Sequence, residues 1–167
     1  AQRVFYCGSL SKPLAPGLRT NYIVVPRGLM DTYTLSITLV SLLTQLTLVR
    51  FSADGHMAAH MRRMRALYAR RRNVLLDALR EQTADLLAIP RVPEGGLRVA
   101  ATLKHPVDDA RFARQCLAAG IKVDPLSVCY AGPGRSGLIL GFASTPEQYI
   151  PGAVARLASL LRQQLDL

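Results

Sequence analysis

The segment from Ser9 to Arg19 combines a lysine, two serines and an arginine, side chains that can act as a nucleophile or bind a phosphate. Lys12 follows Ser9 and Ser11 and stands seven residues before Arg19. A lysine at the end of a buried strand loses part of its hydration, which lowers the pKa of its amine and frees it for Schiff-base chemistry. Hydroxyls and a guanidinium can together hold a phosphate. A loop rich in Ser, Lys and Pro is also common as a plain solvated turn, so composition alone leaves both interpretations open.

Two short strands are expected on either side of this loop. The first is R-V-F-Y-C (3–7), which stops at Gly8-Ser9, and the second is Y-I-V-V (22–25), which ends at Pro26. A continuous apolar run of the second kind is typical of a strand buried on both faces. We therefore expect the loop to connect two strands of a covered sheet.

Two helices are predicted after the strands. The segment from Leu35 to about Ser52 is helical in pattern but poor in charge, which indicates a helix that is buried or faces a partner. After a turn at Asp54-Gly55, a longer helix is predicted from His56 to Glu81. Its apolar stripe has an arginine, Arg72, where the pattern would otherwise continue. The stripe consists of Met57, Met61, Met64, Tyr68, Leu75 and Leu79, and other faces carry Arg62, Arg63, Arg65, Arg70, Arg71 and Arg80.

A breaker cluster at residues 90–96 separates these helices from a segment of alternating elements. Strands are predicted over 97–103, 121–123 and 138–143, with a helix over 108–119 that is capped by Asp108 and stopped by Gly120. Thr145 is expected to cap the last helix, which Pro151 should bend or restart. The apolar face of that helix consists of Val154, Leu157, Leu161 and Leu165. This succession predicts a compact α/β layer.

Two other patterns suggest weaker sites. His56 and His60 have the helical spacing that lets two imidazoles bind one zinc ion, but no glutamate accompanies them and no third ligand is evident. A-G-P-G-R-S-G (131–137) is rich in glycine but lacks the spacing of a phosphate-binding P-loop. We interpret the histidines as ordinary helix residues, expect no metal, and assign the glycines to a connecting loop.

The balance of charge is strongly basic, with 21 Lys+Arg, 11 Asp+Glu and a formal net charge of +10. Basic charge gives sequence-independent affinity for nucleic acid phosphates. The arginines nevertheless spread around one helix, and no aromatic residues interleave with them as a stacking platform. A solvated or interdomain helix face is the favoured interpretation.

The remaining composition narrows the class of protein. A length of 167 residues, half of them hydrophobic, suits one folded domain and excludes intrinsic disorder. The three cysteines are widely spaced, which argues against a disulfide scaffold and favours the reducing cytoplasm. The longest apolar stretch falls short of the roughly 20 residues a membrane span needs. The chain opens on Ala1 in a strand-like run, from which we expect it to be part of a longer protein.

Several segments resemble one known family. G-S-L-S-K-P-L-A-P-G-L-R-T-N-Y-I-V-V-P (8–26) is similar to the lysine segment of aminotransferases of class I/II, the fold-type-I enzymes that depend on pyridoxal 5'-phosphate (PLP). G-H-M-A-A-H-M-R-R-M-R-A-L-Y-A-R-R-R (55–72) resembles the long helix that follows it in the aminotransferase-like domain of MocR-type regulators of the GntR superfamily. G-G-L-R-V-A (95–100) and G-L-I-L-G-F-A-S-T-P-E (137–147) resemble strands of the small domain. The resemblance covers nearly the whole chain in the family's order.

The resemblance implies a role for each residue of the loop. Lys12 stands at the lysine that forms the internal aldimine with PLP. Ser9 and Arg19 stand where the family binds the cofactor phosphate, and Ser11 is a weaker candidate for the same role.

The sequence also departs from the family pattern. Asn21 replaces a usual glycine, so we expect strain in the turn from Arg19 to Tyr22. Ile139 stands where aminotransferases often carry an arginine for the substrate carboxylate, and Arg98 and Arg135 are the nearest alternatives. The resemblance places the aspartate that binds the pyridine nitrogen, the aromatic residue stacked on the ring and a DNA-binding winged helix-turn-helix before residue 1.

The expected fold is therefore α/β, the C-terminal part of a PLP-dependent type-I transferase fold. We expect residues 1–26 to be a remnant of the large PLP-binding domain, residues 27–90 to be connecting helices, and residues 91–167 to be the small domain. The resemblance implies a regulator that senses an amino acid or amine, forms homodimers and binds DNA through the preceding domain. The alternatives are part of a free-standing aminotransferase of the 2-aminoadipate type, with transaminase activity in the full-length parent, and an inactive orphan piece.

Overall fold

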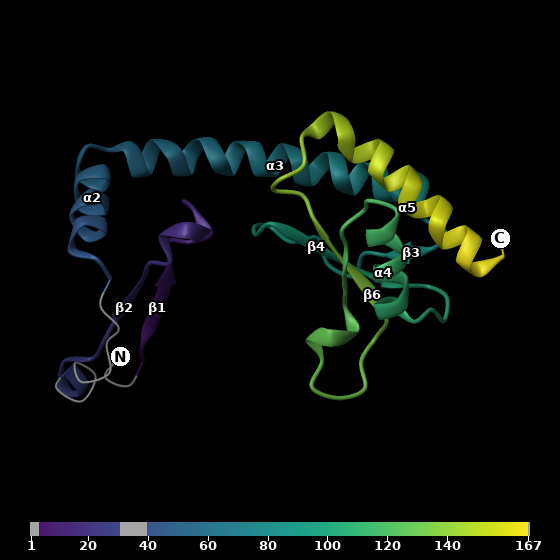
Figure 1. Ribbon diagram of the computed structural model, residues 1–167, viewed down its shortest axis with the longest axis horizontal. Coiled ribbons are helices and arrows are strands. Elements are labelled where there is room, and N and C mark those ends of the chain that lie inside the picture. Colours follow the sequence, from purple (N-terminus) through teal and green to yellow (C-terminus); the bar gives the residue numbers. More distant parts are fainter. Residues whose placement is uncertain (1–3, 31–39, 167) are drawn as a thin grey trace. The chain divides into compact units, whose positions relative to one another are not determined.

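The computed structural model describes residues 4–30 and 40–166, which form two compact units along the chain (Figure 1). The first unit runs to Met64 and the second begins at Arg65. The boundary falls within α3 (His56–Gln82), whose bounds agree with the predicted helix to within a residue. The division expected at residues 26 and 90 concerns the parent fold and stays a prediction.

The first unit begins with an antiparallel hairpin. Its strands are β1 (Tyr6–Ser9) and β2 (Asn21–Val24), paired in register from Tyr6↔Val24 to Ser9↔Asn21. β1 begins later than the predicted strand, of which Arg3 lies outside the described residues. It also continues through Gly8-Ser9, because its end is set by pairing with β2. Within the described residues the two strands pair with each other alone, so Val24 is 59% exposed and the expected burial on both faces is not found.

A helix follows the hairpin in the first unit. α2 (Leu42–Ala53) coincides with the second part of the helix predicted from Leu35, and residues 35–39 lie outside the described residues. Asp54 ends the helix, and Gly55 takes the left-handed conformation (φ 79°) that a glycine adopts without strain. Several apolar side chains of α2 are exposed, among them Leu43 and Val49. Burial of this helix is therefore not found within the described residues, and a helix that faces a partner stays a prediction.

The second unit contains a four-stranded antiparallel sheet in the order β3-β4-β6-β5. The strands are β3 (Leu87–Ala88), β4 (Arg98–Leu103), β5 (Asp124–Pro125) and β6 (Gly137–Gly141). β4 and β6 form its centre, paired from Arg98↔Gly141 to Thr102↔Gly137. β5 lies beyond the predicted strand at 121–123, because its place is set by pairing of Asp124 with Ile139 on β6.

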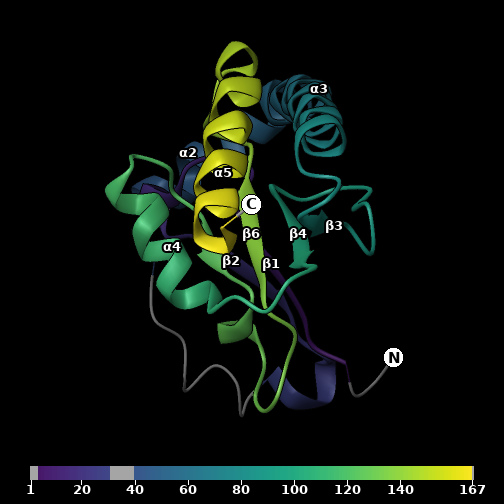
Figure 2. The same cartoon turned by 90° about the vertical axis from the view of Figure 1, so that its right-hand side faces the viewer.

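Two helices cover the sheet (Figure 2): α4 (Asp109–Ala118) and α5 (Ile150–Leu165). The predicted cap of α4 is confirmed, since Asp108 accepts a hydrogen bond from the Arg111 N–H, and Gly120 has a positive φ of 78°. The predicted cap at Thr145 is wrong. α5 begins at Ile150, where Pro151 occupies the first turn and has no intrahelical hydrogen bond to lose.

The hydrophobic core belongs to the second unit. Among the described residues, every buried apolar side chain lies between Leu75 on α3 and Leu161 on α5. Phe112 and Phe142 are its largest members, each 1% exposed. Truncating either to alanine would cost about 3–5 kcal/mol. The second unit therefore holds most of the burial that stabilises this chain.

Candidate functional site

The loop from Ser9 to Arg19 closes the end of the β1–β2 hairpin. The Leu10 N–H donates to the Thr20 carbonyl at 3.0 Å, one step beyond the last strand pair. The Leu14 N–H donates to the Leu10 carbonyl at 3.1 Å, and a short 3-10 helix spans Pro16–Leu18. Local hydrogen bonds thus give the loop a defined backbone.

The structure brings the predicted site residues to this one end of the hairpin. The Ser11 N–H lies 3.4 Å from the Ser9 hydroxyl, so the two serines are joined. Lys12 and Arg19 are both exposed, and among the described residues neither side chain takes part in an ion pair. Two hydroxyls, an amine and a guanidinium with free donors suit a phosphate and an aldehyde. The donor set therefore fits PLP chemically.

Strain in the loop falls on Arg19. Its φ is 47°, the left-handed region in which a side chain is disfavoured by roughly 1–2 kcal/mol. Asn21 lies in β2 with no such φ, so within the turn from Arg19 to Tyr22 the strain falls on Arg19 and not on Asn21. Thr20 holds the backbone beside Arg19, because its hydroxyl donates to the Leu18 carbonyl at 2.8 Å and its side chain is buried. Sequence reasoning missed Thr20, which no motif marks.

A tyrosine packs against a glycine in the hairpin below the loop. Gly8 and Tyr22 are directly opposed, and a Cβ at residue 8 would lie 2.1 Å from Cζ of Tyr22. The rings of Tyr22 and Tyr6 are 6.0 Å apart. A hydrogen bond with the Tyr6 phenol raises the pKa of Tyr22. Gly8 therefore provides the space in which Tyr22 meets Tyr6.

The two histidines that suggested a metal site have different neighbours. The His56 ring packs beside Phe51, with centroids 5.6 Å apart. The His60 Nε2 lies 2.8 Å from the Pro13 carbonyl, and its Nδ1 lies 3.5 Å from Nη2 of Arg63. No group of three or more His, Cys, Asp or Glu side chains that could hold a metal occurs in the described part of the chain.

Some arginines of α3 form hydrogen bonds to backbone carbonyls, and others are solvated. Arg72, placed where the apolar stripe is interrupted, donates from Nη1 to the carbonyls of Pro93 and Glu94, both at 2.9 Å. Arg71 donates to the Ala143 carbonyl. These two side chains fix loops of the second unit, whereas Arg62 and Arg65 are exposed. The helix thus combines structural arginines with a solvated face.

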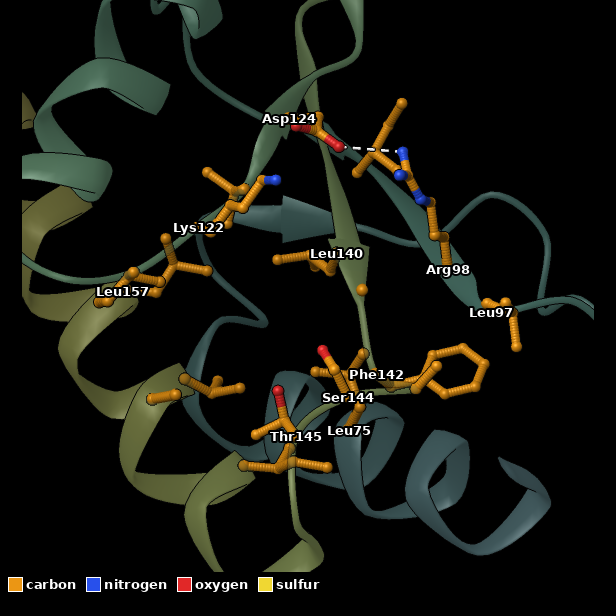
Figure 3. Close-up of a pocket in the computed structure, with 18 of the residues that line it drawn as sticks. Leu75, Leu97, Arg98, Lys122, Asp124, Leu140, Phe142, Ser144, Thr145 and Leu157 are labelled. Atoms are coloured by element: carbon orange, nitrogen blue, oxygen red, sulfur yellow. Dashed lines mark hydrogen bonds and ion pairs between the residues drawn. The ribbon is translucent and has the colours of Figure 1, made fainter. Parts of the chain in front are cut away.

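A cavity of about 560 Å³ lies in the second unit (Figure 3). Its lining is mostly apolar but includes Lys122, and Arg98 and Asp124 meet at 2.9 Å at one end while Ser144 and Thr145 lie at the other. Ile139 also lines it. Arg98, one alternative for a carboxylate-binding arginine, is thus already paired with Asp124. Arg135, the other, is exposed and does not line this cavity.

Asp109 is a buried charged residue that the sequence did not predict. One carboxylate oxygen accepts from the N–H groups of Ser127 and Gly137, each at 2.9 Å, and the other accepts from the Ser127 hydroxyl at 2.6 Å. Burial acts to raise the pKa of Asp109, but these hydrogen bonds outweigh it and hold the pKa below its usual value. Asp109 ties α4 to β6 and to the loop before it.

The sequence relatives of this chain include both regulators and enzymes. No family model matches the chain. The probable rhizopine catabolism regulatory protein MocR of Rhizobium meliloti is 36% identical over 146 residues, which is 84% of this chain and 29% of that protein. Aromatic-amino-acid aminotransferase 1 of Thermococcus litoralis is 28% identical over 98% of this chain and 40% of the enzyme. The chain thus spans about a third of the length of the curated relatives it matches.

Solved structures give the same relationship. The kynurenine aminotransferase of Pyrococcus horikoshii, crystallised in complex with PMP, superposes with a TM-score of 0.85 and 26% identity over 98% of this chain and 42% of that one. The α-aminoadipate aminotransferase LysN of Thermus thermophilus superposes with a TM-score of 0.83 and 25% identity, over 98% of this chain and 43% of that one. These values confirm the predicted fold class.

Within residues 4–30 and 40–166, none of the helices has the length and apolar character needed to cross a bilayer.

The sequence relatives and the solved structures both support the family that the lysine segment resembles. The chain is related to the fold-type-I, PLP-dependent aminotransferase family and corresponds to the C-terminal part of the aminotransferase-like domain of MocR-type regulators.

Proposed function

We propose that this chain is the C-terminal part of a PLP-binding effector domain in a MocR-type transcriptional regulator of the GntR superfamily. The observation that carries the proposal is the loop at the end of the β1–β2 hairpin, which carries Ser9, Ser11, Lys12 and Arg19. The similarity to MocR and to other helix-turn-helix regulators supports a regulator over other contexts of this fold.

In this proposal each residue of the loop has one task. Arg19 and Ser9 bind the cofactor phosphate, Ser11 adds a weaker contact, and Lys12 provides the amine that holds the cofactor. When bound, PLP supplies an aldehyde that condenses with primary amines. The condensation uses the lone pair of the amine, so Lys12 reacts in its neutral form.

The rest of the regulator is also part of the proposal. An amino acid or amine is the effector, a winged helix-turn-helix domain before this chain binds DNA, and the protein is a cytoplasmic homodimer. The exposed apolar side chains of β2 and α2 support burial against a further part of the protein or a second copy of it.

The second candidate is part of a free-standing aminotransferase of the 2-aminoadipate type. The Thermococcus and Thermus enzymes favour it. In that case Lys12 Nζ would also move the proton of the substrate Cα. Ile139 argues against it, because an isoleucine cannot pair with a substrate carboxylate, and Arg98 is bound to Asp124. We therefore prefer the regulator.

The test is carried out on the full-length protein encoded by the reading frame that contains this chain. The regulator requires a winged helix-turn-helix upstream, saturable PLP binding and PLP-dependent, sequence-selective binding to its own promoter DNA. An upstream sequence without a DNA-binding domain, together with amino-group transfer to a 2-oxo acid, would establish the enzyme instead. Failure to bind PLP would contradict both candidates.

A further inference from the structure

We infer that His60 is a positioning residue for Lys12, acting through the backbone carbonyl of Pro13. The inference rests on the proposed role of Lys12 as the lysine that holds the cofactor. It assigns a task to a histidine that the sequence offered only as a weak metal ligand.

The contact joins the lysine loop to a long helix. His60 lies on the second turn of α3, and its Nε2 is 2.8 Å from the carbonyl oxygen of Pro13, 47 residues earlier in the chain. Both residues belong to the first unit and both are partly buried. In the described part of the chain, this is the one hydrogen bond that ties residues 10–20 to an element outside the hairpin.

The partners of His60 indicate which ring nitrogen donates and which accepts. A carbonyl only accepts hydrogen bonds, so Nε2 carries the proton. Arg63 only donates, and its Nη2 lies 3.5 Å from Nδ1, so Nδ1 is the acceptor. A neutral imidazole with the proton on Nε2 satisfies both neighbours. Arg63 thus favours the tautomer that holds Pro13.

Because Pro13 is conformationally restricted, anchoring its carbonyl also restrains the backbone of Lys12. The ring of Pro13 fixes its own φ, and the hydrogen bond from the Leu14 N–H to the Leu10 carbonyl closes the turn that contains Lys12 and Pro13. Lys12 therefore lies one stiff peptide away from a carbonyl that is anchored to a helix. A backbone so anchored holds the Cα of Lys12 in a constant position relative to the rest of the loop, which reduces the entropy lost when the cofactor binds.

Three variants of the full-length protein distinguish positioning of Lys12 from mere stabilisation of the loop. His60→Leu keeps the bulk of the side chain but removes its donor, and His60→Gln restores an N–H that can reach a carbonyl. His56→Leu is the matched control, because His56 lies one turn earlier on α3 and packs beside Phe51.

The first measurement is made without PLP. In His60→Leu, hydrogen exchange of the Leu10 and Leu14 amides should accelerate about 5–10-fold, the equivalent of one net hydrogen bond. His60→Gln should restore most of the protection, and His56→Leu should leave it unchanged. Unchanged exchange in His60→Leu would overturn the anchor.

The second measurement follows the lysine itself. After PLP is added and reduced with borohydride, the initial rate of pyridoxyl labelling at Lys12 should fall about 5–10-fold in His60→Leu and recover in His60→Gln. Faster exchange with normal labelling would mean that His60 only stabilises the loop, and would overturn the positioning role. Labelling of a lysine other than Lys12 in the wild type would instead refute the proposed function, while the exchange data would still decide the anchor.

A third measurement needs no variant, in case His60→Leu does not fold. Nitrogen-15 NMR of histidine-labelled full-length protein should show His60 as the neutral tautomer protonated on Nε2. The tautomer protonated on Nδ1 would contradict the arrangement.

Discussion

Tyr22 occupies the space that a side chain at residue 8 would need. A Cβ on Gly8 would fall 2.1 Å from Cζ and 2.3 Å from Cε1 of the Tyr22 ring. The ring is placed there by the antiparallel pairing of the two residues, and it brings the phenol to Tyr6. Because the same hairpin supports the lysine loop, this contact connects a glycine in β1 to the geometry of the site.

Gly8→Ala should therefore displace the Tyr22 ring and break its hydrogen bond with Tyr6. The pKa of Tyr22, which that hydrogen bond raises, should fall toward its ordinary value near 10. NMR titration of ring-labelled tyrosines in the full-length protein measures this directly. Tyr6→Phe is the control, since it removes the same hydrogen bond without touching Gly8 and should lower the pKa in the same direction. An unchanged Tyr22 titration in both variants would refute the contact.

Asp109 should contribute strongly to the stability of residues 65–167. Asp109→Ala leaves the Ser127 and Gly137 N–H groups without acceptors, and it should cost about 2–4 kcal/mol in chemical denaturation. Asp124→Asn is the matched control. It breaks an exposed ion pair with Arg98 and should cost less than about 1 kcal/mol. Equal costs for the two variants would contradict the account of Asp109.

Asp109 should also give the second unit a characteristic acid sensitivity. Its pKa is lower in the folded state than in the unfolded state, so its contribution is fully present above the unfolded value near 4 and is lost as the pH falls through the folded value. The wild type should lose stability below about pH 4. Asp109→Ala should flatten that part of the profile, and an equally steep loss in the variant would show that other carboxylates dominate.

The two units should differ in hydrogen exchange when the 167-residue chain is studied alone. The buried apolar side chains lie in the second unit, whereas β1 and β2 have exposed faces and edges. We expect strong protection over 96–167 and weak protection over 4–30 and 40–52. Strong and equal protection of all these segments would mean that the hairpin and α2 are stable without further partners.

Local signals in the sequence predicted those elements whose causes are local. Asp108 and Gly120 delimit α4 because a cap and a left-handed stop depend on neighbouring residues. α3 was predicted because its apolar stripe and its arginines have a helical period. The start of β1 and the position of β5 were missed, since each is set by pairing with a distant strand. β3 is only two residues long, too short to produce a pattern.

In the candidate site, too, residues within one segment could be predicted from the sequence, whereas contacts between distant residues could not. Ser9, Ser11, Lys12 and Arg19 could be proposed from the sequence because they lie within one segment that resembles the family's lysine segment, and their roles stay predictions. Asp109 could not, since its partners lie 18 and 28 residues away. The contact between His60 and Pro13 joins residues 47 positions apart, and no sequence motif predicts it. The positive φ at Arg19 depends on the closure of the hairpin, which the sequence predicted only in outline.

Substitutions of Arg19 should separate its charge from its backbone strain. Arg19→Ala should weaken PLP binding by about 1.5–3 kcal/mol, because a hydrogen bond to a charged group is lost. Arg19→Gly should weaken it similarly although it relieves the left-handed conformation. Arg19→Lys should recover part of the affinity, since an ammonium cannot form the paired contact of a guanidinium. Equilibrium titration of the full-length protein with PLP gives all three values, and unchanged affinity in Arg19→Ala would remove Arg19 from the phosphate site.

The central claim is that Lys12 holds the cofactor, and the most direct test is to find which lysine carries it. Full-length protein is saturated with PLP, reduced with borohydride, digested and sequenced by mass spectrometry. We expect a pyridoxyl group on Lys12 in the wild type. In Lys12→Ala we expect no labelled lysine, while some PLP is still held through Ser9 and Arg19. A pyridoxyl group on another lysine in the wild type, or a labelled Lys12→Ala protein, would contradict the assignment.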